Sequence, residues 1–151
     1  PELRHSPAAQ DLVSSTAFRA ELDRLAGGTN ADQGGVMALK RQVLQACAEA
    51  FAQAGTERSA AYESFAARAP DLASYAEFRA YDDLHPGWRT WDVTRNELSA
   101  VADPAAASYH RFVLFVADEQ LASAAARGES RAGLYLDLPP WGRHAFDVSA
   151  L

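Results

Sequence analysis

The sequence has little cysteine and no long apolar run. Cys47 is the only cysteine in 151 residues, so no disulfide framework can form within the chain. No apolar run approaches the roughly 20 residues that a membrane-spanning helix needs, and no signal peptide is visible. We therefore expect a cytoplasmic protein with no membrane partner. The chain begins at Pro1 without an initiator methionine, which indicates a processed product or a piece of a longer protein.

Positive charge is also scarce. Lys40 is the only lysine, and the formal net charge is −6 at pH 7. A protein that binds nucleic acid phosphates needs the opposite sign over its contact surface. We therefore expect no nucleic acid partner.

Motifs for metal and cofactor binding are missing as well. The histidines show no metal-ligand spacing, and no glycine-rich phosphate loop is present. Cys47 lies in the middle of an apolar helical face without a polarising neighbour, which favours a small buried side chain over a nucleophile. The sequence thus predicts no cofactor and no metal.

Most of the chain has the pattern of helices. Ser6-Pro7 is typical of an N-cap followed by a first-turn proline, and a short helix through Val13 should follow. Ser14 or Ser15 can cap the next helix, which Gly27-Gly28 should end. Thr29 to Gly35 is polar and glycine-rich and is predicted to be a loop. The longest amphipathic stretch comes next and ends at Gly55, and its apolar face consists of Val36, Leu39, Val43, Cys47, Ala50, Phe51 and Ala54.

The middle of the chain alternates helices with breaks. A helix should open at Ser59 and end near Pro70, and a second should carry the stripe Leu72, Tyr75 and Phe78. His85-Pro86-Gly87 breaks this pattern, and Trp88 and Trp91 follow in a loop. Paired tryptophans in a loop can stack on sugar rings, but they more often anchor the loop to the protein body, and we favour the second interpretation.

A second long helix should start at Asp103-Pro104 and end at Gly128. Its apolar residues extend beyond one stripe, so the helix is expected to be largely buried; they are Tyr109, Phe112, Val113, Leu114, Phe115, Val116 and Leu121. Gln120 falls within the stripe, where it either holds a neighbouring loop or marks the point at which the stripe emerges.

The only convincing strand comes near the end, at Gly133 to Leu138, and is closed by Pro139-Pro140. A short apolar run of this kind is typical of a buried strand in a parallel sheet. Alternation places Asp137 on the face opposite the leucines. Asp137 either faces a cleft, as catalytic residues do at barrel strand ends, or caps the strand and begins the turn. The fold class is therefore mostly α, with one isolated β-strand near the C-terminus.

Several segments resemble one enzyme family. YHRFVLFVADEQLASAAARGESRAGLYLDLPP, from Tyr109 onward, resembles the helix, connection and strand that precede the catalytic core of bacterial 4-α-glucanotransferases (amylomaltases, glycoside hydrolase family 77). Upstream, MALKRQVLQACAEAF and YAEFRAYDDLHPGWRTW are similar to family segments in the same order. The segment after Pro139 departs from the family pattern, because its loop is shorter and different.

The resemblance implies a (β/α)₈ barrel interrupted by helical insertions. Residues 1–132 would be one helical insertion, and residues 133–151 would be a barrel strand and the loop after it. The family transfers α-1,4-glucan segments between malto-oligosaccharides, and Asp137 and Trp141 would contact this substrate. The catalytic carboxylates belong to family motifs that do not occur here, so no catalytic residue is assigned.

The isolated chain is therefore expected to be an inactive fragment. Its single strand would pair with a second copy, pack irregularly or fray. The alternative is a self-contained helical domain that binds a partner protein or a glucan without catalysis.

Overall fold

The computed structural model describes residues 2–53 and 57–127 of the chain. These residues form helices joined by short connections and contain no strand, which confirms the prediction of a mostly helical fold. The predicted strand at Gly133 to Leu138 and the predicted boundary after residue 132 lie outside the described residues. The chain divides into two compact units after Glu63.

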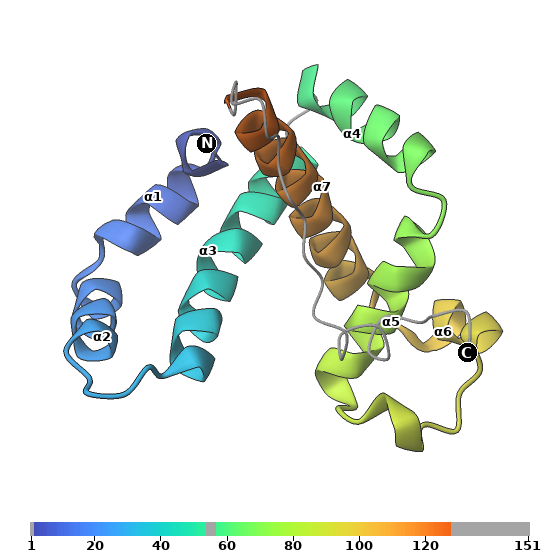
Figure 1. Cartoon of the computed structure of the whole chain (residues 1–151), viewed down its shortest axis with the longest axis horizontal. Helices are drawn as coiled ribbons and strands as arrows, with labels where there is room; N and C mark the ends of the chain where they lie inside the picture. The colour runs from blue at the N-terminus through green and yellow to red at the C-terminus, as the bar shows by residue number, and fades with distance from the viewer. Residues whose placement is uncertain (1, 54–56, 128–151) are drawn as a thin grey trace. The chain divides into compact units, whose positions relative to one another are not determined.

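The first unit contains a short 3₁₀ turn, three complete helices and the first turns of a fourth (Figure 1). The turn η1 spans Glu2–His5, α1 spans Pro7–Ser14, α2 spans Thr16–Ala26 and α3 spans Gln33–Gln53. Both α1 and α2 contact the long helix α3, and α1 also contacts α2. The first unit is thus built around α3.

Local signals in the sequence set the ends of α1 and α2. The Ser6 hydroxyl accepts the Ala9 N–H at 3.2 Å and caps α1, and the Ser15 hydroxyl accepts the Phe18 N–H at 3.2 Å and caps α2. Gly27 ends α2, and its N–H bonds to the Asp23 carbonyl. These ends confirm the predicted caps, and Ser15 rather than Ser14 is the second cap.

The start of α3 was predicted too late. The expected loop reached Gly35, but α3 begins at Gln33. The reason is the Asp32 carboxylate, which accepts the Gly35 N–H at 2.8 Å and so satisfies a free amide of the first turn. Two glycines are therefore held in the helix despite their low helix propensity.

The buried residues of the first unit lie on α1, on α3 and at the cap of α1. Ala9 of α1 is fully buried, and Leu39 and Cys47 of α3 are also buried. Ser6 is 1% exposed, and its hydroxyl donates to the Ala46 carbonyl of α3 at 3.1 Å. Burial of Cys47 confirms that it packs as a small apolar side chain.

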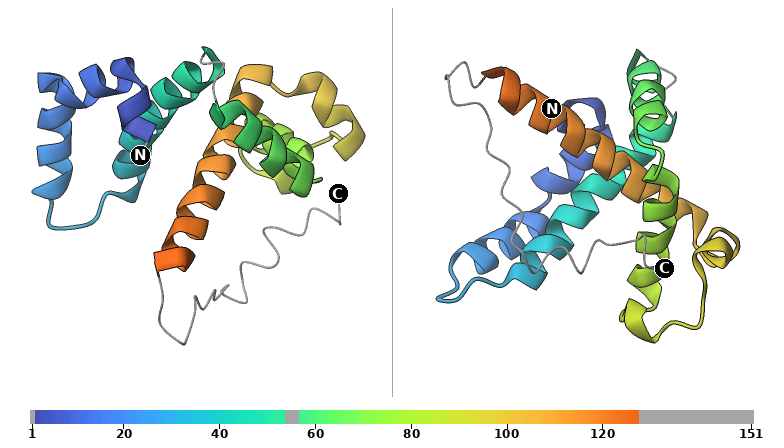
Figure 2. Two further views of the ribbon diagram at one scale, coloured as in Figure 1. Left: turned by 90° about the horizontal axis from the view of Figure 1, so that it is seen from above. Right: turned by 45° about the vertical axis from the view of Figure 1, so that its right-hand side comes forward.

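Helix α4 spans Glu57–Arg68, and the division between the units falls inside it. It begins two residues before the predicted start at Ser59 and ends before Pro70. The second unit continues with α5 (Leu72–Leu84), the 3₁₀ turn η2 (Trp88–Thr90), α6 (Arg95–Val101) and α7 (Pro104–Arg127). Figure 2 shows α7 crossing α5, with α6 also in contact with α5.

Small residues line the centre of the second unit. Ala76 and Ala80 of α5 form a buried cluster with Ala102 and with Ala107 of α7. Side chains of this size let helix backbones approach closely. The second unit also buries larger apolar residues. These are Phe65, Leu72, Phe78, Leu98, Phe112, Phe115 and Val116. Leu72 and Phe78 of the predicted stripe are thus buried, while Tyr75 is half-buried.

Helix α7 is buried over only part of its length. Phe112, Phe115 and Val116 are 2–4% exposed, but Leu121 is 44% exposed. Gln120 and the residues 121–126 are all exposed. The prediction that Leu121 belongs to a buried surface is therefore wrong, and Gln120 marks the point where the apolar stripe emerges.

Helix α6 was not predicted. A local signal for it is present, because Thr94 and Glu97 form a capping box at its start. The Glu97 carboxylate accepts the Thr94 N–H at 2.8 Å, and this hydrogen bond lowers the pKa of Glu97.

Among the described helices, none combines the length and the apolar character required to cross a bilayer.

Candidate functional site

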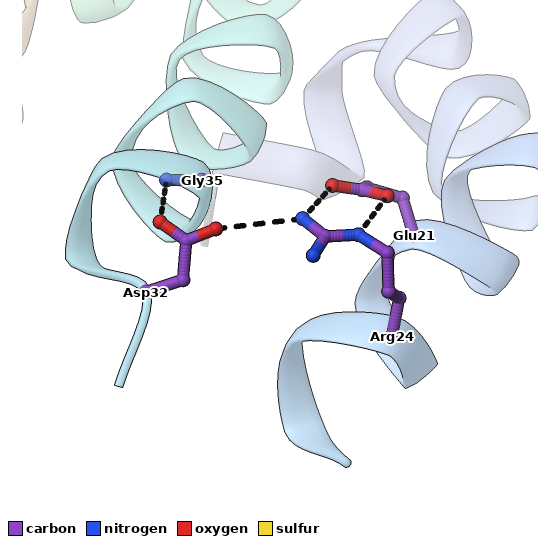
Figure 3. A network of polar contacts seen from close by, with 4 residues as sticks. All are labelled: Glu21, Arg24, Asp32 and Gly35. Atoms are coloured by element: carbon purple, nitrogen blue, oxygen red, sulfur yellow. Dashed lines mark hydrogen bonds and ion pairs between the residues drawn. The ribbon is translucent and has the colours of Figure 1, made fainter. Parts of the chain in front are cut away.

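Two carboxylates and one arginine meet where α2 and α3 approach each other (Figure 3). The Arg24 Nε and Nη2 atoms donate to the two Glu21 carboxylate oxygens at 2.8 and 2.7 Å. The same Nη2 lies 3.4 Å from the Asp32 Oδ2 atom, and the other Asp32 oxygen accepts the Gly35 N–H. The site joins the last turns of α2 to the first turn of α3.

Paired carboxylates can act as a general acid and a general base, so this site is a candidate for catalysis. A general acid at neutral pH needs a raised pKa. Here the hydrogen bond from Arg24 lowers the pKa of Glu21, and the hydrogen bond from the Gly35 N–H, followed by Arg24, lowers the pKa of Asp32. Both carboxylates therefore stay ionised at neutral pH. They suit an ion-pair link between α2 and α3 better than acid–base catalysis.

A second candidate is the aromatic cluster at the end of α5. Phe78 lies 5.2 Å from Trp91 and 6.4 Å from Trp88, measured between ring centroids. Tyr81 stacks on the His85 ring at 4.1 Å and meets the edge of Trp91 at 4.7 Å. Both tryptophans therefore pack back onto the helix that precedes them.

Polar contacts hold this loop in place. The Trp91 Nε1 atom donates to the His85 carbonyl at 2.6 Å, and the Arg89 guanidinium lies 4.6 Å from the Trp88 ring centroid and covers one face of it. Gly87 has a φ of 105°, a left-handed conformation that favours glycine. The cluster thus confirms that Trp88 and Trp91 anchor the loop.

Ionisable side chains also pair between α5 and α7. The His110 Nε2 atom lies 2.8 Å from the Asp83 Oδ2 atom, and the two side chains are 11% and 16% exposed. Arg111 lies 3.6 Å from Glu77. Sequence reasoning missed both pairs, and no local signal exists for them because each joins residues about 30 positions apart in the chain.

Neither a reactive cysteine nor a cluster of metal-binding side chains is found among the described residues. Burial, and then the Glu2 charge, raise the pKa of the Cys47 thiol, so little thiolate forms there. Across residues 2–53 and 57–127, no group of three or more His, Cys, Asp or Glu side chains could hold a metal ion. The predicted substrate residues Asp137 and Trp141 lie outside the described part of the chain.

Comparison with known proteins supplies the family. No curated protein and no solved structure matches the chain. A family model described as 4-alpha-glucanotransferase matches residues 6–141, which cover most of the sequence and include Asp137 and Trp141. The chain therefore belongs to the 4-alpha-glucanotransferase family.

Proposed function

We propose that this chain is the helical insertion, with one barrel strand, of a 4-α-glucanotransferase-like enzyme. The enzyme moves α-1,4-glucan segments between malto-oligosaccharides in the cytoplasmic metabolism of glycogen and maltodextrin. The observation that carries the proposal is the family match over residues 6–141. The described helices, which bury their own apolar cores, suit a supporting role around a catalytic domain.

We propose further that the isolated chain is not catalytic. A retaining glycosyl transfer needs two carboxyl groups about 5–5.5 Å apart, one of them a nucleophile and the other a general acid with a raised pKa. Glu21 and Asp32 share Arg24, and both have lowered pKa values. Neither suits the role of the acid, which supports the assignment of the chemistry to residues outside this chain.

A disproportionation assay tests this assignment. The 151-residue chain is incubated with maltotriose, and glucose and longer malto-oligosaccharides are separated and quantified. We expect no products from the chain alone. A longer protein that contains this chain and the sequence encoded after it should produce both. Turnover by the isolated chain, abolished by Glu21→Gln, would instead place an acid–base residue in the α2–α3 site.

Asp137 and Trp141 are the proposed contacts to the glucan. Their test is the KM for maltotriose in the longer protein, measured for Asp137→Asn and Trp141→Ala. We expect a raised KM in both variants, since each would remove a contact to bound sugar. Trp88→Phe is the matched control, because the Trp88 ring already packs against Phe78 and Arg89. An unchanged KM in both test variants would remove these residues from the substrate site.

The alternative is a helical domain that binds a glucan or a protein partner without catalysis. The observation that supports this alternative is that each unit buries apolar residues of its own. Titrating the isolated chain with maltoheptaose while following tryptophan fluorescence separates the two functions. A saturable change would support glucan binding by this chain alone. A flat response, together with activity of the longer protein, would support the insertion.

We also propose self-association through the Gly133 to Leu138 segment, because an unpaired strand offers free backbone hydrogen bonds. Sedimentation velocity of the isolated chain at increasing concentration should then show a dimer. Leu136→Pro should abolish it, since proline cannot donate to a strand ladder. A monomer at every concentration, or a dimer that Leu136→Pro leaves intact, would contradict the proposal.

A further inference from the structure

We draw no further inference here: the strongest candidate, the set of exposed apolar side chains Leu22 of α2 and Val36 and Met37 of α3 on the first unit, carries nothing because nothing in the structure shows what covers it.

Discussion

Ser6 makes two contacts whose contributions to stability can be separated by mutation. Its hydroxyl accepts the Ala9 N–H at 3.2 Å, which caps α1, and donates to the Ala46 carbonyl of α3 at 3.1 Å. Ser6 is 1% exposed, its bond with Ala9 is buried and its bond with Ala46 is part-buried, so the groups that lose their partner in Ser6→Ala gain little contact with solvent. The substitution should therefore weaken both the start of α1 and its attachment to α3.

The expected loss follows from these two contacts. Removing a serine cap costs about 1 kcal/mol, and losing the part-buried hydrogen bond to Ala46 costs about 1 kcal/mol more. Ser6→Ala should thus lower the free energy of unfolding by about 2 kcal/mol. Ser15→Ala is the matched control, because Ser15 also caps a helix but its second bond, to Leu12, stays within the neighbouring turn. The control should cost about 1 kcal/mol.

Urea unfolding followed by far-ultraviolet circular dichroism measures both losses, with the slope of the transition checked for constancy. All three tryptophans follow Glu63, so fluorescence reports on the second unit and helps to assign the transitions if two appear. Equal losses in the two variants would refute the reasoning, since the contact from Ser6 to α3 would then contribute nothing beyond the cap.

Three further outcomes are expected. Phe115 is 2% exposed, so Phe115→Ala should lower the free energy of urea unfolding by about 3–5 kcal/mol; a loss like that of an exposed residue would contradict its place in the core. Arg24→Gln should bring the lowered pKa of Glu21 back toward its usual value in a carboxyl NMR titration. Because folding lowers the pKa of Glu21, the Glu21–Arg24 pair stabilises the protein at pH values above the pKa of Glu21 in the unfolded chain. This contribution is lost as pH falls through the folded-state pKa. An Arg24→Gln variant with the same acid sensitivity as the original protein would argue against it. The buried Cys47 thiol, with its raised pKa, should react slowly with a disulfide reagent in buffer and rapidly in urea, and fast labelling in buffer would show that the site is open.

Helix ends were the most predictable part of the fold. Ser6, Gly27 and the His85-Pro86-Gly87 break act through hydrogen bonds and dihedral angles within one turn, so the residues themselves carry the information. Two of the errors at helix starts, those of α3 and α6, had the same kind of signal. Asp32 three residues before Gly35, and Thr94 three before Glu97, are both capping patterns.

The candidate sites were less predictable. Glu21 lies three residues from Arg24 on the same helix, but only the packing of α2 beside α3 brings Asp32 to Arg24. The same holds for His110 and Asp83. The spacing and loop position of Trp88 and Trp91 favoured a role as loop anchors. The contacts with Phe78 and Tyr81 were needed to show it.

The sequence by itself determined that the chain is mostly helical, where most helices end and which family it belongs to. These features depend on neighbouring residues and on the order of segments along the chain. The tertiary structure decided which apolar residues are buried, as Phe115 is and Leu121 is not, although both lie on α7. It also decided which charges meet. Burial and charge pairing depend on which surfaces come together in space, and the periodicity of one helix does not contain that information.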